Sequence, residues 1–287
     1  MPLSYASNSS SLVAQRNLQS NTNKLSQTFA RLSSGLRLNR AADGPADIQV
    51  ADALRADSRT ATVAIRNAND GLSLAYIADS ALDEIGSALT RMTELATQSA
   101  NGVYTNTQRS ALQSEFESLG SEIERIAKTT EFNNLKLLSN SASVTLQVGL
   151  DGSTSSNFTI AAVLGTLNSV GLASNNSSKL IYSLTGNTDM AAQTASQLAL
   201  DAVNSALGSI TARRGIFGAA ESRLSTAIDY LSVARENFVA AESRIRDADI
   251  AQEVANMVRL QVLQQAGTAV LAQANLQPSV AYSLLQT

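Results

Sequence analysis

An apolar residue recurs at every seventh position through the second half of the chain, and this repeat constrains the fold more than any other feature. It begins at Val203 and continues through six residues that we call the rod seam: Ile210, Phe217, Leu224, Leu231, Phe238 and Ile245. Alanine follows most of them three residues later. Sustained heptads predict a long coiled-coil helix, and alanine at the second core position predicts close approach of the partner helix. Gly215 and Gly218 predict a local irregularity in it.

The first half of the chain supplies partners for this helix. Six residues also recur by sevens there: Ala61, Ala68, Ala75, Leu82, Leu89 and Ala96. A turn signal follows in SANGVYTN, residues 99–106. An amphipathic stretch comes next, with apolar residues at Leu112, Phe116, Leu119, Ile123 and Ile126. The two helices of the first half and the long helix of the second half predict a three-helix rod.

The segment between the two halves has a different pattern. VTLQVG at 144–149 and NFTIAA at 157–162 flank DGSTSS, which predicts a strand, a turn and a second strand. The following residues are rich in Gly, Ser, Asn and Thr. We therefore expect residues 140–190 to form a small β-hairpin-containing insertion with exposed loops.

The two ends of the chain predict a pair of helical arms. Leu18, Leu25 and Leu32 share one face of a helix that should break at Asp43-Gly44-Pro45. At the other end the heptads lose register near Asp247. Arms of similar length at opposite ends of a hairpin should meet as an antiparallel pair. Polar residues interrupt their apolar stripes, so such a pair should be marginal alone and should require further copies; they include Asn17, Asn21, Gln264 and Gln265.

Composition excludes most chemistry. The chain has 24 acidic and 21 basic residues, so there is no basic footprint for nucleic acid. It has no Cys and no His, which removes disulfides, the usual nitrogen and sulfur ligands of zinc, and the best acid–base group at neutral pH. No P-loop or Gly-x-Ser-x-Gly elbow is present. Asp247 and Asp249 are best interpreted as a helix break with an N-cap, not as a metal site. We expect no catalysis and no cofactor.

We expect neither a membrane-spanning segment nor a secretory signal peptide. No apolar run reaches the roughly 20 residues that span a bilayer, so we expect no membrane insertion. The start, MPLSYASNSSSLVAQRN, lacks the basic and apolar regions of a secretory signal peptide.

Long motifs at both ends resemble the bacterial flagellins. They are LVAQRNL (12–18), RLSSGLRLNRAADGPAD (31–47), RNANDGLSLAYIADSALDEI (66–85), LTRMTELATQSANG (89–102), FNNLKLL (132–138), SRIRDADIAQEVANMVRLQVLQQAGTAVLAQAN (243–275) and SLL (283–285). The resemblance covers residues 1–150 and 190–287 and is weak between them. Gly44-Pro45-Ala46-Asp47 departs from the family's usual Asp-Ala-Ala-Gly, which concerns the geometry of that junction.

The resemblance implies a mainly α fold, an elongated antiparallel coiled-coil rod with helical terminal arms and the small insertion. The implied parts are an N-terminal arm (1–42), the rod (43–139 and 191–246), the insertion (140–190) and a C-terminal arm (247–287). The arms would be disordered in the monomer and order in an inner tube when subunits stack. The residues implied in that core are Leu18, Leu25, Leu32, Leu36, Ile250, Val254, Met257, Leu263 and Val270. Asp43, Gly44, Pro45 and Asp247 would form the hinge.

The resemblance also implies partners and a location. The chain would be exported unfolded without a cleaved signal, with the help of an export chaperone, and would polymerise with itself outside the cell beneath cap and junction proteins. Arg91, Leu95 and Glu115 align with residues through which some flagellins are sensed by a Toll-like receptor, although the residues alone fit a solvated face and a packing position. Residues 153–156 and 174–178 are weak candidates for glycosylation.

Two rival functions remain at this point. A hook–filament junction protein would share the terminal arms. A soluble coiled-coil signalling rod resembling chemoreceptor cytoplasmic domains would share the alanine-rich heptads, but as a continuous hairpin. The breaks near Pro45 and Asp247 and the β insertion argue against the signalling rod.

Overall fold

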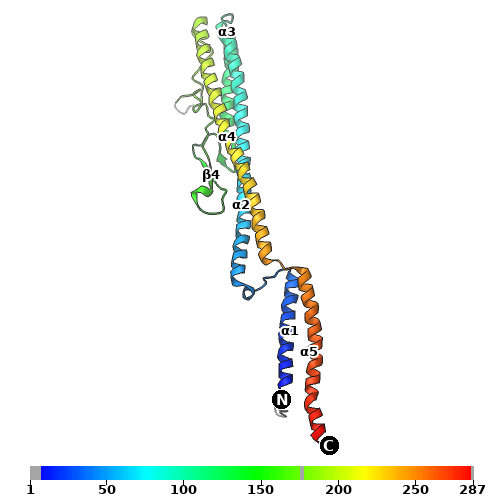
Figure 1. Ribbon diagram of the computed structural model, residues 1–287. Coiled ribbons are helices and arrows are strands. Elements are labelled where there is room, and N and C mark those ends of the chain that lie inside the picture. The colour runs from blue at the N-terminus through cyan, green and yellow to red at the C-terminus, as the bar shows by residue number, and fades with distance from the viewer. Residues whose placement is uncertain (1–7, 175–177, 286–287) are drawn as a thin grey trace. The chain divides into compact units, whose positions relative to one another are not determined.

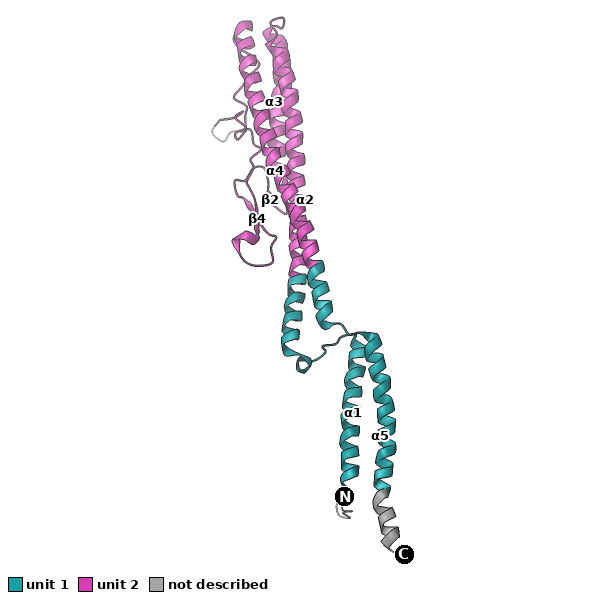
Figure 2. Ribbon diagram, in the orientation of Figure 1, with its two compact units in different colours: residues 1–58, 236–287 teal, residues 59–235 magenta. Residues whose placement is uncertain are grey.

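The computed structural model describes residues 8–174 and 178–285, and five long α-helices account for most of them (Figure 1). Their contacts divide the chain into two compact units (Figure 2). Unit 1 contains residues 1–58 and 236–287, and unit 2 contains residues 59–235. This division lies inside α2 (Pro45–Ala100) and α4 (Asp189–Arg246), each of which continues from one unit into the other.

Unit 2 is built on α2, α3 (Asn106–Thr129) and α4, which lie side by side (Figure 1). The heptads form its core. On α2 the residues at 61, 68, 75, 82, 89 and 96 are all buried, and on α4 so are Ile210, Phe217, Leu224 and Leu231 of the rod seam. Phe116 and Ile123 of α3 are fully buried as well. The predicted three-helix arrangement is confirmed. The predicted irregularity near Gly215 and Gly218 is wrong, because α4 runs through both positions without interruption.

Two small antiparallel sheets follow α3, the first just before the insertion and the second within it. One pairs β1 (Glu131–Phe132) with β2 (Leu135–Lys136), and the other pairs β3 (Val144–Gln147) with β4 (Asn157–Ile160), in the register Val144 opposite Ile160. The predicted hairpin is therefore confirmed. A short 3₁₀ turn, η2 (Thr154–Ser156), precedes β4.

Two leucines of the insertion pack against glycines of the helices. A Cβ at Gly71 of α2 would lie 2.2 Å from a methyl carbon of Leu146, and one at Gly120 of α3 would lie 2.6 Å from a methyl carbon of Leu180. Any larger residue would push the insertion away from the helices. The space left by these two glycines explains how an insertion rich in Gly, Ser and Asn packs in a defined position against the helices.

A buried and a partly buried polar side chain of the helices hold the rest of the insertion by hydrogen bonds. Glu124 of α3 accepts the N–H of Leu167 at 3.0 Å, and Arg213 of α4 donates to the carbonyl of Ser169 at 2.6 Å. Arg213 stands at the one position of the α4 repeat, from Ala206 to Ala241, where alanine is missing. Its guanidinium bonds to the insertion, which accounts for that interruption.

Unit 1 contains α1 (Ser9–Ser34), a 3₁₀ turn η1 (Ala41–Asp43), the first part of α2, the last part of α4, and α5 (Ile250–Leu285). Helix α1 ends earlier than the predicted break at Asp43. Its C-cap is Gly35, whose φ of 70° is left-handed and favours glycine. Leu36 therefore lies beyond the helix, in a β-bridge with Asp247.

Candidate functional site: the terminal helix pair and its junction

Helices α1 and α5 pack side by side, and much of what they bury against each other is polar (Figure 1). Ser11, Thr28 and Glu253 are buried alongside Ala14, Leu25, Leu260 and Ala274. Glu253 forms an ion pair with Arg31 at 3.2 Å, and the Ser11 hydroxyl bonds to the side chain of Asn275 at 2.7 Å. The Asn8 amide donates to the carbonyl of Ala274 at 2.8 Å. These contacts fix how the two helices pair, but they bury little apolar surface.

Many large apolar side chains of α5, and a few of α1, point outward. On α5 the exposed side chains include Ile250, Val254, Val258, Val262, Leu263, Val270 and Leu276, and on α1 they include Leu12, Val13 and Phe29. An apolar residue faces outward on nearly every turn of α5 as far as Leu276. Apolar side chains exposed in succession along a helix form a surface that other protein normally covers. The pair is therefore incomplete within one chain.

The predicted core residues of the arms lie on both sides of this pair. Leu25 is buried, and Leu18, Leu32, Leu36 and Met257 are half-buried. Ile250, Val254, Leu263 and Val270 are exposed on α5. The structure thus assigns the first group to contact within the chain and leaves the second group uncovered.

The junction between the arms and the following helices is held by backbone contacts. The Arg37 N–H donates to the carbonyl of Arg246 at 2.7 Å, and the Ala248 N–H donates to that of Gly35 at 2.9 Å. Side chains reinforce them, since the Arg37 guanidinium donates to the carbonyl of Ile245 at 2.6 Å. Both chain breaks are thereby tied to each other.

The predicted hinge residues occupy this junction. The Asp43 carboxylate accepts the N–H groups of Arg40 and Asn39, at 2.9 and 3.0 Å, and these bonds hold the pKa of Asp43 below its usual value. Pro45 begins α2, where its missing N–H costs nothing. Asp247 accepts the hydroxyl of Ser243.

The acidic residues of the junction are structural. Asp249 accepts the N–H of Gln252 at 3.1 Å, as an N-cap of α5 does. Across the described residues, His, Cys, Asp and Glu side chains nowhere gather in threes that could hold a metal ion.

Arg91, Leu95 and Glu115 lie in unit 2 with different exposures. Arg91 donates to Glu115 at 2.9 Å and to Glu94 at 2.7 Å, and all three side chains are exposed. The Glu115 carboxylate, followed by Glu94, raises the pKa of Arg91. Leu95 is 1% exposed and belongs to the core of unit 2. As a direct contact for a partner, Leu95 is therefore unsuited in this conformation.

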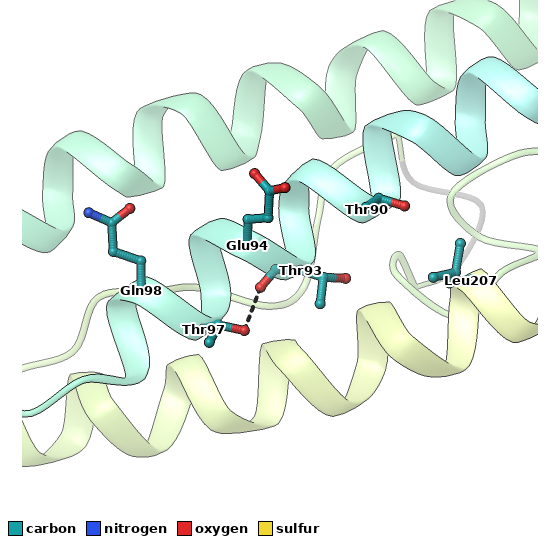
Figure 3. Close-up of a pocket in the computed structure, with 6 residues that line it drawn as sticks. All are labelled: Thr90, Thr93, Glu94, Thr97, Gln98 and Leu207. Atoms are coloured by element: carbon teal, nitrogen blue, oxygen red, sulfur yellow. Dashed lines mark hydrogen bonds between the residues drawn. The ribbon is translucent and has the colours of Figure 1, made fainter.

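A shallow groove of about 480 Å³ lies beside this ion pair, between α2 and α4 (Figure 3). It is lined by Thr90, Thr93, Glu94, Thr97, Gln98 and Leu207. Each threonine hydroxyl donates to the carbonyl four residues earlier, at 2.8–3.0 Å. Because those hydroxyls are satisfied within α2, the groove offers mainly methyl groups. It has no arrangement for acid–base or nucleophilic work.

Sequence reasoning missed the buried charge at the far end of unit 2. Arg109 is 1% exposed and donates to the carbonyls of Ser99, Asn101 and Asp189 at 2.8–3.0 Å. It thereby joins the end of α2, the start of α3 and the start of α4. The sequence shows an arginine in the first turn of an amphipathic helix, a position that is normally exposed, so no signal marked it.

Comparison with known proteins decides the family. The profile of the bacterial flagellin N-terminal helical region matches residues 6–143, and that of the C-terminal helical region matches residues 200–285. A flagellin of Halalkalibacterium halodurans is 40% identical over 95% of this chain and 96% of its own length. The chain belongs to the bacterial flagellin family. Flagellins are structural proteins of the extracellular flagellar filament.

Further relatives extend the match over the whole chain. The flagellar filament 33 kDa core protein of Treponema phagedenis is 33% identical over 97% of this flagellin and 98% of its own length. A putative flagellar hook-associated protein from Vibrio parahaemolyticus has a similar fold, with a TM-score of 0.57 over 71% of this chain and all of that one, at 14% identity. The latter likeness concerns the fold alone. None of the helices in the described part of the chain combines the length and apolar character of a membrane-crossing segment.

Proposed function

We propose that this flagellin polymerises into the filament through the outward apolar faces of α1 and α5. The observation that carries the proposal is the placement of polar and apolar side chains in the α1–α5 pair. Ser11, Thr28 and Glu253 are buried between the helices, whereas Val254, Val258 and Val262 are exposed. Covering one such valine contributes roughly 1.5 kcal/mol or more. Repeated in every subunit of a helical lattice, such contacts order the arms and stiffen the polymer.

The same apolar surface explains why the chain would need a chaperone and an export route before it polymerises. The exposed apolar side chains among the described residues of this helix pair would cause aggregation in the cytoplasm, so an export chaperone would cover them. The absence of cysteine suits a chain that travels unfolded to the outside. At the growing end, cap and junction proteins would meet the same arms.

The filament subunit is favoured over the hook–filament junction protein. Similarity to a filament core protein extends over nearly the full length of both chains, whereas the hook-associated protein shares the fold at low identity.

Introducing negative charge on the outward face of α5 tests whether this face drives polymerisation. Purified wild type and the double variant Val254→Asp, Val262→Asp are seeded with filament fragments and observed by negative-stain electron microscopy. We expect filaments from the wild type and soluble subunits from the variant, with an unchanged circular dichroism spectrum. The matched control Val254→Ile, Val262→Ile keeps the surface apolar and should polymerise. Filaments from the aspartate variant would overturn the proposal.

For recognition by the innate receptor, we propose two of the three residues that the resemblance suggested as direct contacts. Arg91 and Glu115 present an exposed ion pair to a receptor, while Leu95 supports the helix beneath them. Monomeric wild type should activate a reporter cell that carries the flagellin-sensing Toll-like receptor, and Arg91→Ala should activate it less. Equal activation by both would exclude this surface.

A further inference from the structure

One Asn-Gly pair occurs in the sequence, and it lies at an exposed turn. Asn101 and Gly102 follow the last residue of α2 and precede α3, and both are exposed. Glycine has no side chain to hinder the approach of its backbone nitrogen to the side-chain carbonyl carbon of the preceding asparagine. An Asn-Gly pair outside regular structure can therefore close on itself.

The local hydrogen bonds prepare that closure. The Val103 N–H donates to Oδ1 of Asn101 at 3.1 Å, so a donor already sits on the oxygen that becomes negative when the carbonyl carbon is attacked. In the part of the chain that the structure describes, the Gly102 N–H has no backbone acceptor, whereas Asn101 and Tyr104 on either side donate to Gln98 and Asn101. The attacking nitrogen is thus free.

We propose that Asn101 is a site of spontaneous covalent modification, in which its side-chain amide is converted to an isoaspartate. The Gly102 nitrogen loses its proton and bonds to Cγ of Asn101. The Cγ–Nδ2 bond breaks, ammonia leaves, and a five-membered succinimide remains. One water then opens the ring. The net change is amide plus water to carboxylate plus ammonium, with no oxidation or reduction.

Arg109 directs which ring bond opens. Its Nη2 donates to the main-chain carbonyl oxygen of Asn101 at 3.0 Å. A guanidinium on that oxygen polarises the main-chain carbonyl of the succinimide and favours attack of water there. Opening at this carbonyl leaves the chain joined through Cγ, which is the isoaspartate product. Opening at Cγ would give ordinary aspartate.

The isoaspartate product also suits the buried arginine. Opening at the main-chain carbonyl turns the very oxygen that Arg109 contacts into part of a free carboxylate. Arg109 is 1% exposed, and its ion pair with the Asp189 carboxylate is long, at 4.0 Å. A neutral carbonyl acceptor on the buried cation is thereby replaced by a carboxylate, and a hydrogen bond between two opposite charges is the stronger one. The folded turn therefore steers the reaction and stabilises its product.

The test follows residue 101 in the full-length protein. Wild-type chain is incubated at mildly alkaline pH, and samples are digested and analysed by mass spectrometry with electron-transfer fragmentation, which separates isoaspartate from aspartate. Two references define intrinsic chemistry: the same chain in urea and a synthetic peptide of residues 99–106. The matched control is Gly102→Ala. Gly102 is not among the glycines with left-handed φ, and its Cβ would lie 3.7 Å from the Gln193 side chain, an ordinary contact.

Three results support the proposal together. Residue 101 gains the mass of an amide-to-acid exchange in the folded chain, the isoaspartate share exceeds that in urea and in the peptide, and Gly102→Ala slows conversion by about tenfold or more. If residue 101 stays asparagine while the peptide converts, the turn protects the site and the proposal is wrong. If the folded chain and the peptide give the same product ratio, the role of Arg109 is overturned.

Discussion

The core of unit 2 and the α1–α5 pair are both helix-on-helix contacts, yet they use side chains in opposite ways. In unit 2 large apolar residues such as Leu82, Phe116 and Leu224 are fully buried. In the arm pair serine, threonine and glutamate are buried, while valines and leucines are exposed. The first region completes its core within one chain, and the second does not. Heptad spacing therefore identifies a helix interface, but it does not show whether the partner helix comes from the same chain or from another copy.

The largest expected effect is in the completed core. Leu224→Ala removes a fully buried side chain of α4 and should lower the free energy of unfolding by about 3 kcal/mol. Thermal unfolding followed by circular dichroism measures it. Leu198→Ala, at a position that is 58% exposed on the same helix, is the control and should change little. Equal losses from the two changes would contradict the assignment of Leu224 to the stabilising core.

A smaller effect is expected from the same change in the arms. Leu260→Ala removes a side chain that is 7% exposed on α5. We expect the main thermal transition of the monomer to stay in place, because that transition belongs to unit 2. The filament should instead dissociate at a lower temperature, as measured by light scattering. A monomer transition lowered as much as by Leu224→Ala would show that the arms and unit 2 unfold as one.

An unpaired carboxylate in unit 2 offers a stabilising change. Among the described side chains, Glu221 has a buried oxygen, Oε1, without a hydrogen-bond partner. Burial, followed by the charge of Asp79, raises the pKa of Glu221. Because the folded state holds this proton more tightly, the unfavourable contribution appears as pH rises above the unfolded value. Glu221→Gln should therefore stabilise the protein at neutral pH by about 1 kcal/mol, and less at acid pH. A chemical denaturation series at both pH values decides this, and destabilisation by glutamine at pH 7 would contradict it.

The smallest expected effect concerns the junction. The pKa of Asp43 is lowered by the N–H groups of Arg40 and Asn39, so its stabilising contribution is present at neutral pH and is lost as pH falls through the lowered pKa. Asp43→Asn should remove this dependence. Amide hydrogen exchange at Asn39 and Arg40, compared between wild type and variant across acid pH, measures it. Protection that does not change with pH in wild type would contradict the assignment.

Much of the fold could be predicted because its signals are periodic and local. The sevenfold repeats on α2 and α4 identified residues that are buried, and the alternation around DGSTSS identified the β3–β4 hairpin. The end of α1 was misplaced because Asp43-Gly44-Pro45 is a stronger turn signal than Gly35, whose left-handed φ caps the helix.

The candidate site was only partly predictable, because exposure is a property of three-dimensional packing. Val254 and Met257 are both apolar and lie one turn apart in the sequence, yet Val254 is exposed and Met257 is partly buried. Leu95 was grouped with Arg91 by sequence, and packing separates it from the surface.

Residue spacing and composition are enough to show that this flagellin is helical, that its helices pair through small and branched apolar residues, and that its ends form arms rich in polar residues. Those properties act over a few residues at a time. Three features emerge only from the packing of the folded chain: Arg109 is buried, Gly71 and Gly120 make room for leucines of the insertion, and α5 leaves apolar side chains uncovered. Each of these features depends on residues that are far apart in the sequence, so no local sequence pattern can reveal it.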